Sequence, residues 1–193
     1  VAQLLAGKVP VLSASDLYLN EHREYGLSTY SKHSDGTGVA ISSRLRPILN
    51  MRPKYRHWLS PSLWQLNADL HLTDWLEEKN IDFDVVTDED LHVEGVDLLN
   101  RYKCVLTGSH PEYSSEKMLA AYESYQLNGG RWIYLGSDGF YWISEYHPDN
   151  PNIIEVRKGE AGTRAWTANP GEYNNAFDGK YGGMWRARGR IPS

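Results

Sequence analysis

A strand, a helix and a second strand in direct succession restrict the fold of this chain more than any other feature. Residues 102–107 (YKCVLT) form a short apolar run typical of a buried strand. Residues 114–128 then show a helical pattern, which ends at Gly129 and Gly130. Another apolar run follows at 131–135 (RWIYL). Because this succession is typical of parallel strands, we expect an α/β protein.

The rest of the chain extends this pattern. We expect further strands at 8–13 and 82–87, and a helix at 63–79 whose apolar residues recur at spacings of three and four. The predicted architecture has three layers, with a mostly parallel sheet between helices. Residues 1–145 form the predicted α/β domain, with a long insertion at 15–61, and 146–193 form a polar, Gly-rich, β-rich extension of what we expect to be a longer protein.

Composition narrows the possible partners. The net charge of −5 argues against a nucleic-acid partner, because phosphate binding depends on a high density of Lys and Arg. No apolar run is long enough to cross a bilayer, so we expect no membrane partner. The single cysteine, Cys104, excludes a disulfide within the chain, and a reducing cytoplasm is the simplest expected location.

The turn between the strand at 102–107 and the following helix carries reactive side chains. His110 and Glu112 stand there, beside Ser109 and Tyr113. Since the start of a helix favours negative charge, Glu112 can remain ionised as a metal ligand or a base. The chain has no Gly-x-Ser-x-Gly elbow, no P-loop and no His-Glu-x-x-His. This residue set therefore favours metal or acid–base chemistry.

Five motifs together carry a resemblance to a known family. They are SDLYLNE (15–21), YGLSTYSKHSDGTG (25–38), SRLRP (43–47), VTDEDLH (86–92) and GSHPEY (108–113). They resemble the N,N-dimethylformamidase large (beta) subunit family, and the resemblance covers most of the chain. It implies a domain similar to the class I glutamine amidotransferases, a flavodoxin-like fold. The amidotransferase nucleophile is absent, because Cys104 lies within the strand and not on the turn.

The resemblance also implies a metal centre. Tyr18, Tyr30 and Glu112 would bind one ferric ion (Fe3+), and His110 would stand beside it as a catalytic acid or base, with Glu112 as the second catalytic residue. Hard anionic oxygen donors suit a trivalent cation, and three of them cancel its charge. The expected reaction is hydrolysis of a small formamide-like amide by metal-activated water. The expected partners are a small subunit and a second large subunit, which makes the protein an oligomer.

Several residues allow a second interpretation. Glu112 could be a carboxylate that only stabilises the helix start, His110 could cap the turn, and Tyr113 is expected to pack. Asp138, which follows the strand at 131–135, is a candidate for contact with the metal ligands. His33 with Asp35 is expected to be a solvated turn, and the arginines of the insertion are expected to form salt bridges.

A different class of protein also fits the sequence. It is a non-catalytic amidotransferase-like scaffold or ligand-binding module. This alternative predicts that the candidate Tyr and Glu side chains lie apart or form hydrogen bonds with protein atoms.

Overall fold

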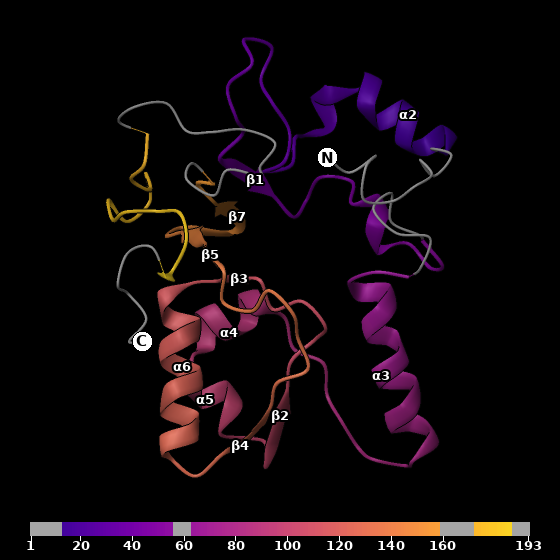
Figure 1. Ribbon diagram of the computed structural model, residues 1–193, viewed down its shortest axis with the longest axis vertical. Coiled ribbons are helices and arrows are strands. Elements are labelled where there is room, and N and C mark those ends of the chain that lie inside the picture. The colour runs from indigo at the N-terminus through magenta and orange to yellow at the C-terminus, as the bar shows by residue number, and fades with distance from the viewer. Residues whose placement is uncertain (1–12, 56–62, 159–171, 187–193) are drawn as a thin grey trace. The chain divides into compact units, whose positions relative to one another are not determined.

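The structure is a computed structural model that describes residues 13–55, 63–158 and 172–186. The chain forms two compact units: unit 1 comprises Val1–Tyr25 and Arg46–Val85, and unit 2 comprises Gly26–Leu45 and Val86–Ser193. The described elements, labelled in Figure 1, are α2 (Ala14–Glu21), the 3-10 helix η1 (Arg23–Tyr25), β1 (Ile41–Ser43), the 3-10 helix η2 (Leu49–Met51), α3 (Leu66–Glu78), α4 (Asp88–Glu94), α5 (Val96–Leu99), β2 (Cys104–Leu106), β3 (Tyr113–Ser114), α6 (Glu116–Leu127), β4 (Arg131–Ile133), β5 (Trp142–Ile143), β6 (Glu145–His147) and β7 (Asn150–Glu155). The chain is a mixed α/β protein, as predicted.

Helix α2 of unit 1 begins at a capping box. The Ser13 side chain accepts from the Asp16 backbone N–H, and the Asp16 carboxylate accepts from the Ser13 backbone N–H at 2.9 Å. Arg52 donates to the same carboxylate at 3.2 Å, which ties α2 to the segment after η2. Ser13 is therefore a helix cap and not the end of a strand. The remainder of the strand predicted at 8–13 lies outside the described residues.

The helix predicted at 63–79 is confirmed as α3. Leu76 and Asn67 are its buried residues, and the Asn67 amide donates to the Asn50 backbone oxygen at 3.0 Å. Leu70 and Trp75 each leave about half of their surface exposed, at 47%. The apolar spacing thus placed the helix correctly, although only part of the apolar stripe is covered within unit 1.

The strand predicted at 82–87 is wrong. These residues pair with no strand in the described part of the chain, and Val85 is 75% exposed. Thr87 ends the segment as the N-cap of α4, in a capping box with Asp90. The apolar run that suggested a strand is therefore an extended connection, because no described strand pairs with its backbone.

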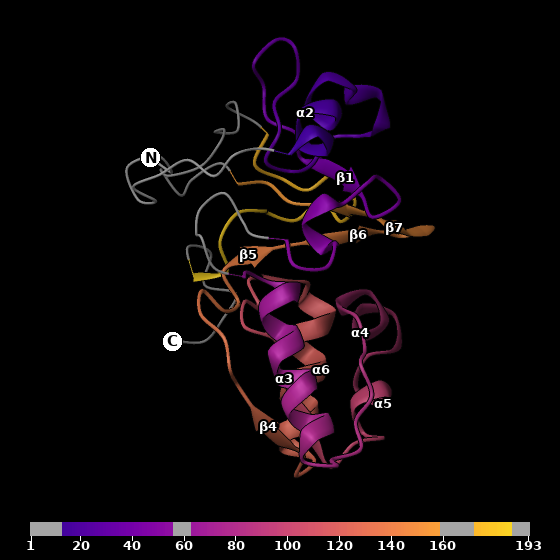
Figure 2. The ribbon, with the colours of Figure 1, turned by 90° about the vertical axis from the view of Figure 1, so that its right-hand side faces the viewer.

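The core of unit 2 is mainly helical. Helices α4, α5 and α6 bury their apolar residues against one another, and Figures 1 and 2 both show the three helices side by side. Gly95, at φ 64°, makes the tight junction between α4 and α5. The buried residues of this helical cluster are Leu91, Leu98, Leu99, Met118, Ala121 and Tyr125, and Val105 of β2 packs against them.

The central strand–helix–strand unit is confirmed. Strand β2 pairs in parallel with β4, with Val105 opposite Trp132, and α6 connects them by way of β3. A second parallel pair joins β3 to β5. The described strands form three small sheets, so the single mostly parallel sheet of an amidotransferase-like domain stays a prediction. Strands of two or three residues carry too few ladder bonds for their pairing to be read from sequence.

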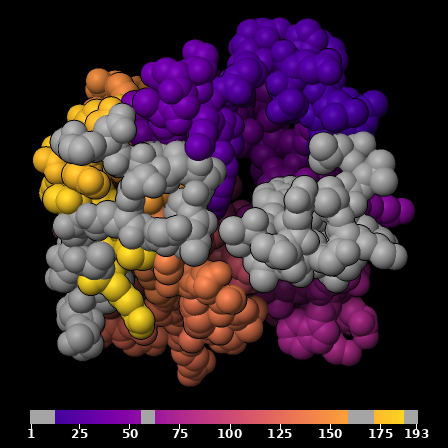
Figure 3. Space-filling model, turned by 45° about the horizontal axis from the view of Figure 1, so that its top comes forward, coloured from indigo at the N-terminus to yellow at the C-terminus, as the bar shows by residue number. Residues whose placement is uncertain are grey.

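The third sheet is antiparallel and joins distant parts of the sequence. Strand β7 lies between β1 of the predicted insertion and β6. Glu155, at the end of β7, is fully buried, and its carboxylate accepts from the backbone N–H groups of Ala176 and Phe177 and from Arg157. These bonds attach the described residues 172–186, whose yellow atoms border the orange ones of unit 2 in Figure 3. The predicted domain boundary at residue 145 remains a prediction.

His92 of α4 makes the stability of unit 2 depend on pH. It is 7% exposed, and its Nδ1 lies 2.8 Å from the Ser115 hydroxyl. Burial, and then the charge of Lys117, lower the pKa of His92 to about 4. An unfolded histidine has a pKa of about 6.5, so between these values the unfolded chain binds more protons. His92 therefore contributes stability that is present above pH 6.5 and is lost as the pH falls toward 4.

We predict that the free energy of unfolding in urea falls less between pH 7 and pH 4.5 in His92→Gln than in the wild type. His71→Gln, which changes an exposed histidine of α3, is the matched control and should keep the wild-type pH dependence. An unchanged pH dependence in His92→Gln would contradict the assignment.

Candidate functional site

The reactive turn of the sequence is a loop between two strands. Residues 107–112 connect β2 to β3, and β3 precedes the N-cap of α6, Ser115. Glu112 therefore lies three residues before the cap, and its interpretation as a helix-start carboxylate is wrong. The sequence analysis missed β3 because a strand of two residues leaves no periodic signal.

A second segment holds this loop in place. The backbone N–H groups of Ser137 and Phe140 donate to the backbone oxygens of Ser109 and Pro111, at 3.0 and 2.9 Å. Two further N–H groups, from Tyr141 and Trp142, converge on the Glu112 backbone oxygen. The connection from β4 to β5 thus fixes the loop backbone.

The Glu112 carboxylate has a specific donor. Its Oε1 accepts from the indole N–H of Trp142 at 3.1 Å. Trp142 is 1% exposed, whereas Glu112 is half-buried. The side chain of Glu112 is therefore oriented by a buried neighbour.

Tyr113, the residue that follows Glu112, contacts a tyrosine from a distant part of the chain. The Tyr30 and Tyr113 hydroxyls are hydrogen-bonded to each other across 83 residues of chain. Tyr30 is 52% exposed and stands in the connection before β1, while Tyr113 begins β3. Tyr30 and Glu112 are both predicted ligands. The structure thus places Tyr30 in contact with Tyr113, the residue next to Glu112 in the sequence.

A buried cation completes this group. Lys158 is 1% exposed, and its Nζ lies 3.1 Å from the centroid of the Tyr30 ring and 5.3 Å from that of Tyr113. The same Nζ donates to the Thr29 hydroxyl at 3.1 Å. Sequence reasoning missed Lys158 and assigned Tyr113 to packing. A charged residue near the end of a strand gives no signal that it will be buried, and the contact of Tyr113 with Tyr30 joins residues 83 positions apart in the sequence.

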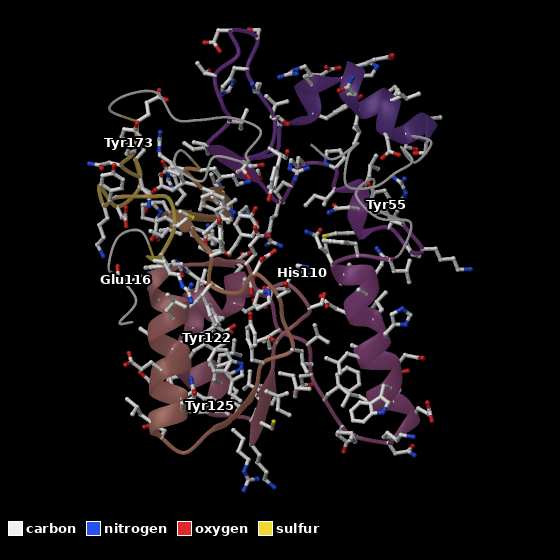
Figure 4. All side chains as sticks on the ribbon, viewed as in Figure 1. Tyr55, His110, Glu116, Tyr122, Tyr125 and Tyr173 are labelled. Atoms are coloured by element: carbon white, nitrogen blue, oxygen red, sulfur yellow. The ribbon has the colours of Figure 1, made fainter. Side chains whose placement is uncertain are left out.

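His110 and Asp138 remain candidates. His110 is half-buried, its Nδ1 lies 3.3 Å from the Ser109 hydroxyl, and Figure 4 labels it on the loop before β3. Asp138 is exposed, in the loop after β4, with a positive φ of 50°. A non-glycine residue in that region of backbone space is uncommon, and contact of Asp138 with the metal ligands stays a prediction.

Tyr18 belongs to unit 1. It lies on α2, it is 48% exposed, and its hydroxyl is 3.3 Å from that of Tyr25. The hydrogen bond with Tyr25, followed by the charge interaction with Tyr25, raises the pKa of Tyr18 above its usual value of 10. Its assignment as a ligand therefore depends on the family resemblance alone.

Other charged residues take structural positions. The Asp35 carboxylate accepts from the backbone and hydroxyl of Thr37, which confirms the predicted turn. Arg44 pairs with Glu89 at 2.7 Å, and Arg52 pairs with Asp16 at 3.2 Å, as expected of scaffolding. Within the described ranges no three His, Cys, Asp or Glu side chains could share a metal ion. A metal site in that part of the chain would need other donors, such as phenols.

No helix of the described residues is both long and apolar enough to reach across a bilayer.

The fold and site together define the class of protein: a mixed α/β domain in which the Tyr30 hydroxyl meets that of Tyr113 in a short parallel strand, next in sequence to Glu112, whose carboxylate accepts from Trp142. A family model described as "N,N-dimethylformamidase beta subunit-like, C-terminal" matches residues 15–193. The chain belongs to this family, as the motifs indicated.

Two relatives are similar along almost the whole chain. The chain is 50% identical over 191 residues to the N,N-dimethylformamidase beta subunit of Paracoccus aminophilus, and 49% identical over 191 residues to that of Alcaligenes sp. Each alignment covers 98% of this chain and 25% of the relative. The chain thus spans about a quarter of the length of these relatives.

Proposed function

We propose that the chain is the metal-binding part of an amide hydrolase that cleaves the C–N bond of a small formamide-like substrate. The observation that carries the proposal is the meeting of Tyr30 and Tyr113 at the loop where Trp142 orients the Glu112 carboxylate. The names of the two relatives support the choice of substrate class. Because these relatives are named beta subunits, we also propose a partner subunit. The family resemblance implies a second copy of the large subunit in the assembly.

The oxygen donors fit a ferric ion. Phenolate and carboxylate are hard anionic ligands, the type that a small trivalent cation prefers. Tyr30 and Glu112 would supply two of them, and Tyr18 is proposed as the third. The Lys158 ammonium over the Tyr30 ring stabilises negative charge on that phenol. When bound, the ferric ion supplies Lewis-acid polarisation of the amide carbonyl and lowers the pKa of a water molecule.

The protein side chains then have separate tasks. Glu112 and Tyr30, together with a third anionic ligand, would cancel the charge of the cation, which would let an uncharged amide bind without an unpaired charge in the site. His110 accepts a proton from the attacking water and returns it to the departing amine. We assign this transfer to Nε2, because Nδ1 faces the Ser109 hydroxyl.

Acid should release the metal. A free tyrosine has a pKa of about 10, so a phenolate at neutral pH depends on a neighbouring cation. Protons and the metal therefore compete for the same oxygens.

The non-catalytic alternative is supported by one observation. Both Tyr30 and Glu112 form hydrogen bonds with protein atoms, as a scaffold predicts. These bonds are compatible with metal binding, since an ionised carboxylate has about four acceptor sites and one indole N–H uses one.

The test of the proposal is hydrolysis of dimethylformamide by the intact protein that contains this chain. Dimethylamine release should stop when a chelator removes iron at mildly acidic pH and should return when iron is restored. Release that persists in metal-free protein would overturn the metal-dependent mechanism, and an iron-loaded protein that hydrolyses no amide would favour the scaffold.

A further inference from the structure

One asparagine of the chain stands directly before a glycine, at an exposed turn. Asn128 is the C-cap of α6, and Gly129 and Gly130 lead from it into β4 (Figure 1). This is the only Asn-Gly pair in the sequence. Asn128 and Gly129 are both exposed, and a Cβ atom placed on Gly129 would meet nothing within 4 Å. The Asn128 side chain is therefore open to solvent, and no side chain at position 129 blocks the approach of the backbone to it.

We propose that Asn128 is a site of spontaneous deamidation. The Gly129 backbone nitrogen loses its proton to solvent and attacks the side-chain carbonyl carbon of Asn128. A bond between these two atoms forms, the bond from that carbon to the side-chain nitrogen breaks, and ammonia leaves. Water then opens the cyclic imide at one of its two carbonyl carbons and gives aspartate or isoaspartate. Water is the only co-reactant, and the reaction does not depend on the proposed function.

The closed helix end holds the two reacting atoms apart. The ψ angle of Asn128 is 4°, which turns the Gly129 nitrogen away from the Asn128 side chain, whereas the five-membered ring needs this nitrogen beside Cβ. The Gly129 N–H also donates to the Gln126 backbone oxygen at 3.0 Å. Chain segments near the end of an element open more readily than its centre. The reaction therefore follows the opening of the last turn of α6 and is slower in the folded protein than in the unfolded chain.

The product carboxylate forms beside two cations. Asn128 lines a hollow of about 370 Å³ on the surface of unit 2, together with Asn100, Lys103 and Arg131. Lys103 and Arg131 are exposed and form no ion pair with another described residue, and no described Asp or Glu lines the hollow. A negative charge at the C-terminal end of a helix is unfavourable by itself. The two cations offset this cost, so the charged product is tolerated at the end of α6.

The first test follows the mass of the peptide around residue 128 while the intact protein is incubated at mildly alkaline pH, folded and in urea. We expect the mass change of an NH2 group replaced by OH, about 5–30-fold more slowly in the folded protein, because a helix end opens at small cost in free energy. Asn128→Gln should convert more slowly than the wild type in both states, since its longer side chain would have to close a six-membered ring. An amide at residue 128 that persists in the folded protein while it converts in urea would overturn the proposal. Equal rates in the two states would overturn the role of the turn.

Asn100 is the internal control in the same spectra. It is the C-cap of α5 and lines the same hollow, but Arg101 and not a glycine follows it. We expect Asn100 to keep its amide over the time in which Asn128 loses it. Equal conversion of the two residues in the folded protein would contradict the assignment to the Asn-Gly turn.

A second test introduces the product charge directly. Asn128→Asp is compared in the wild type and in a protein that also carries Lys103→Gln and Arg131→Gln, with stability measured by urea unfolding at low salt. The substitution should lower the midpoint of unfolding less in the wild type, where both cations are present. An equal loss in the two backgrounds would overturn the role of Lys103 and Arg131.

Discussion

Replacing Glu112 with alanine will strip the iron from the protein and stop amide hydrolysis, and Tyr30→Phe will do the same. Loss of a residue that only supports a ligand lowers metal affinity by about 10–100-fold, so loss of a ligand itself should exceed about 100-fold. Tyr30→Phe is the sharper change, because it keeps the ring beneath the Lys158 ammonium and removes only the hydroxyl. Iron per protein, measured by elemental analysis after dialysis, gives the result.

The matched control for Tyr30→Phe is Tyr113→Phe. Tyr113 is the hydrogen-bond partner of Tyr30, but it is not a proposed ligand, so this variant should keep its iron. Full iron in Tyr30→Phe would contradict the proposed site. Loss of iron in Tyr113→Phe and not in Tyr30→Phe would move the phenolate to Tyr113.

Tyr18 requires its own comparison, with Tyr25→Phe as the control. The two hydroxyls are hydrogen-bonded, so both variants remove the same bond, but only Tyr18→Phe should lose iron. Full iron in Tyr18→Phe would show that another residue supplies the third oxygen.

Replacing His110 with alanine will leave the iron in place and lower turnover by about 10²–10⁴-fold, the usual effect of removing one proton-transfer group. His110 stands on the same loop as Glu112, and its Nδ1 lies 3.3 Å from the Ser109 hydroxyl. Steady-state rates with dimethylformamide, together with iron content, separate the two roles. Loss of iron in His110→Ala would make His110 a ligand and overturn its assignment as acid and base.

Ser109→Ala is the control for His110. It removes the side chain beside Nδ1 and keeps the imidazole, so its turnover should fall less than that of His110→Ala. An equal fall would mean that the orientation of the ring, and not its proton, limits the rate.

The sequence predicted the elements whose signals are local. Helices α3 and α6 follow from apolar spacing, and β2 and β4 from short apolar runs beside clear helix ends. The run at 82–87 has similar composition but forms no described strand, because pairing depends on a partner that local sequence does not reveal. The overall class was therefore predictable, and the division into three small sheets was not.

The candidate site was also predictable from the sequence only in part. The loop with His110 and Glu112 stood out as a set of reactive residues, and the motifs identified the family. The contacts of Tyr30 with Tyr113 and Lys158 join residues far apart in the sequence, and only the fold brings them together. Trp142 gave no signal as a partner of Glu112, since a buried tryptophan more often fills a core.

The visible absorption spectrum of the purified, iron-loaded intact protein tests the central claim most directly. Phenolate oxygens on a ferric ion absorb visible light, so we predict a coloured protein with about one iron per chain, whose absorption band is lost in Tyr30→Phe and persists in Tyr113→Phe. A colourless protein without stoichiometric iron would contradict the account.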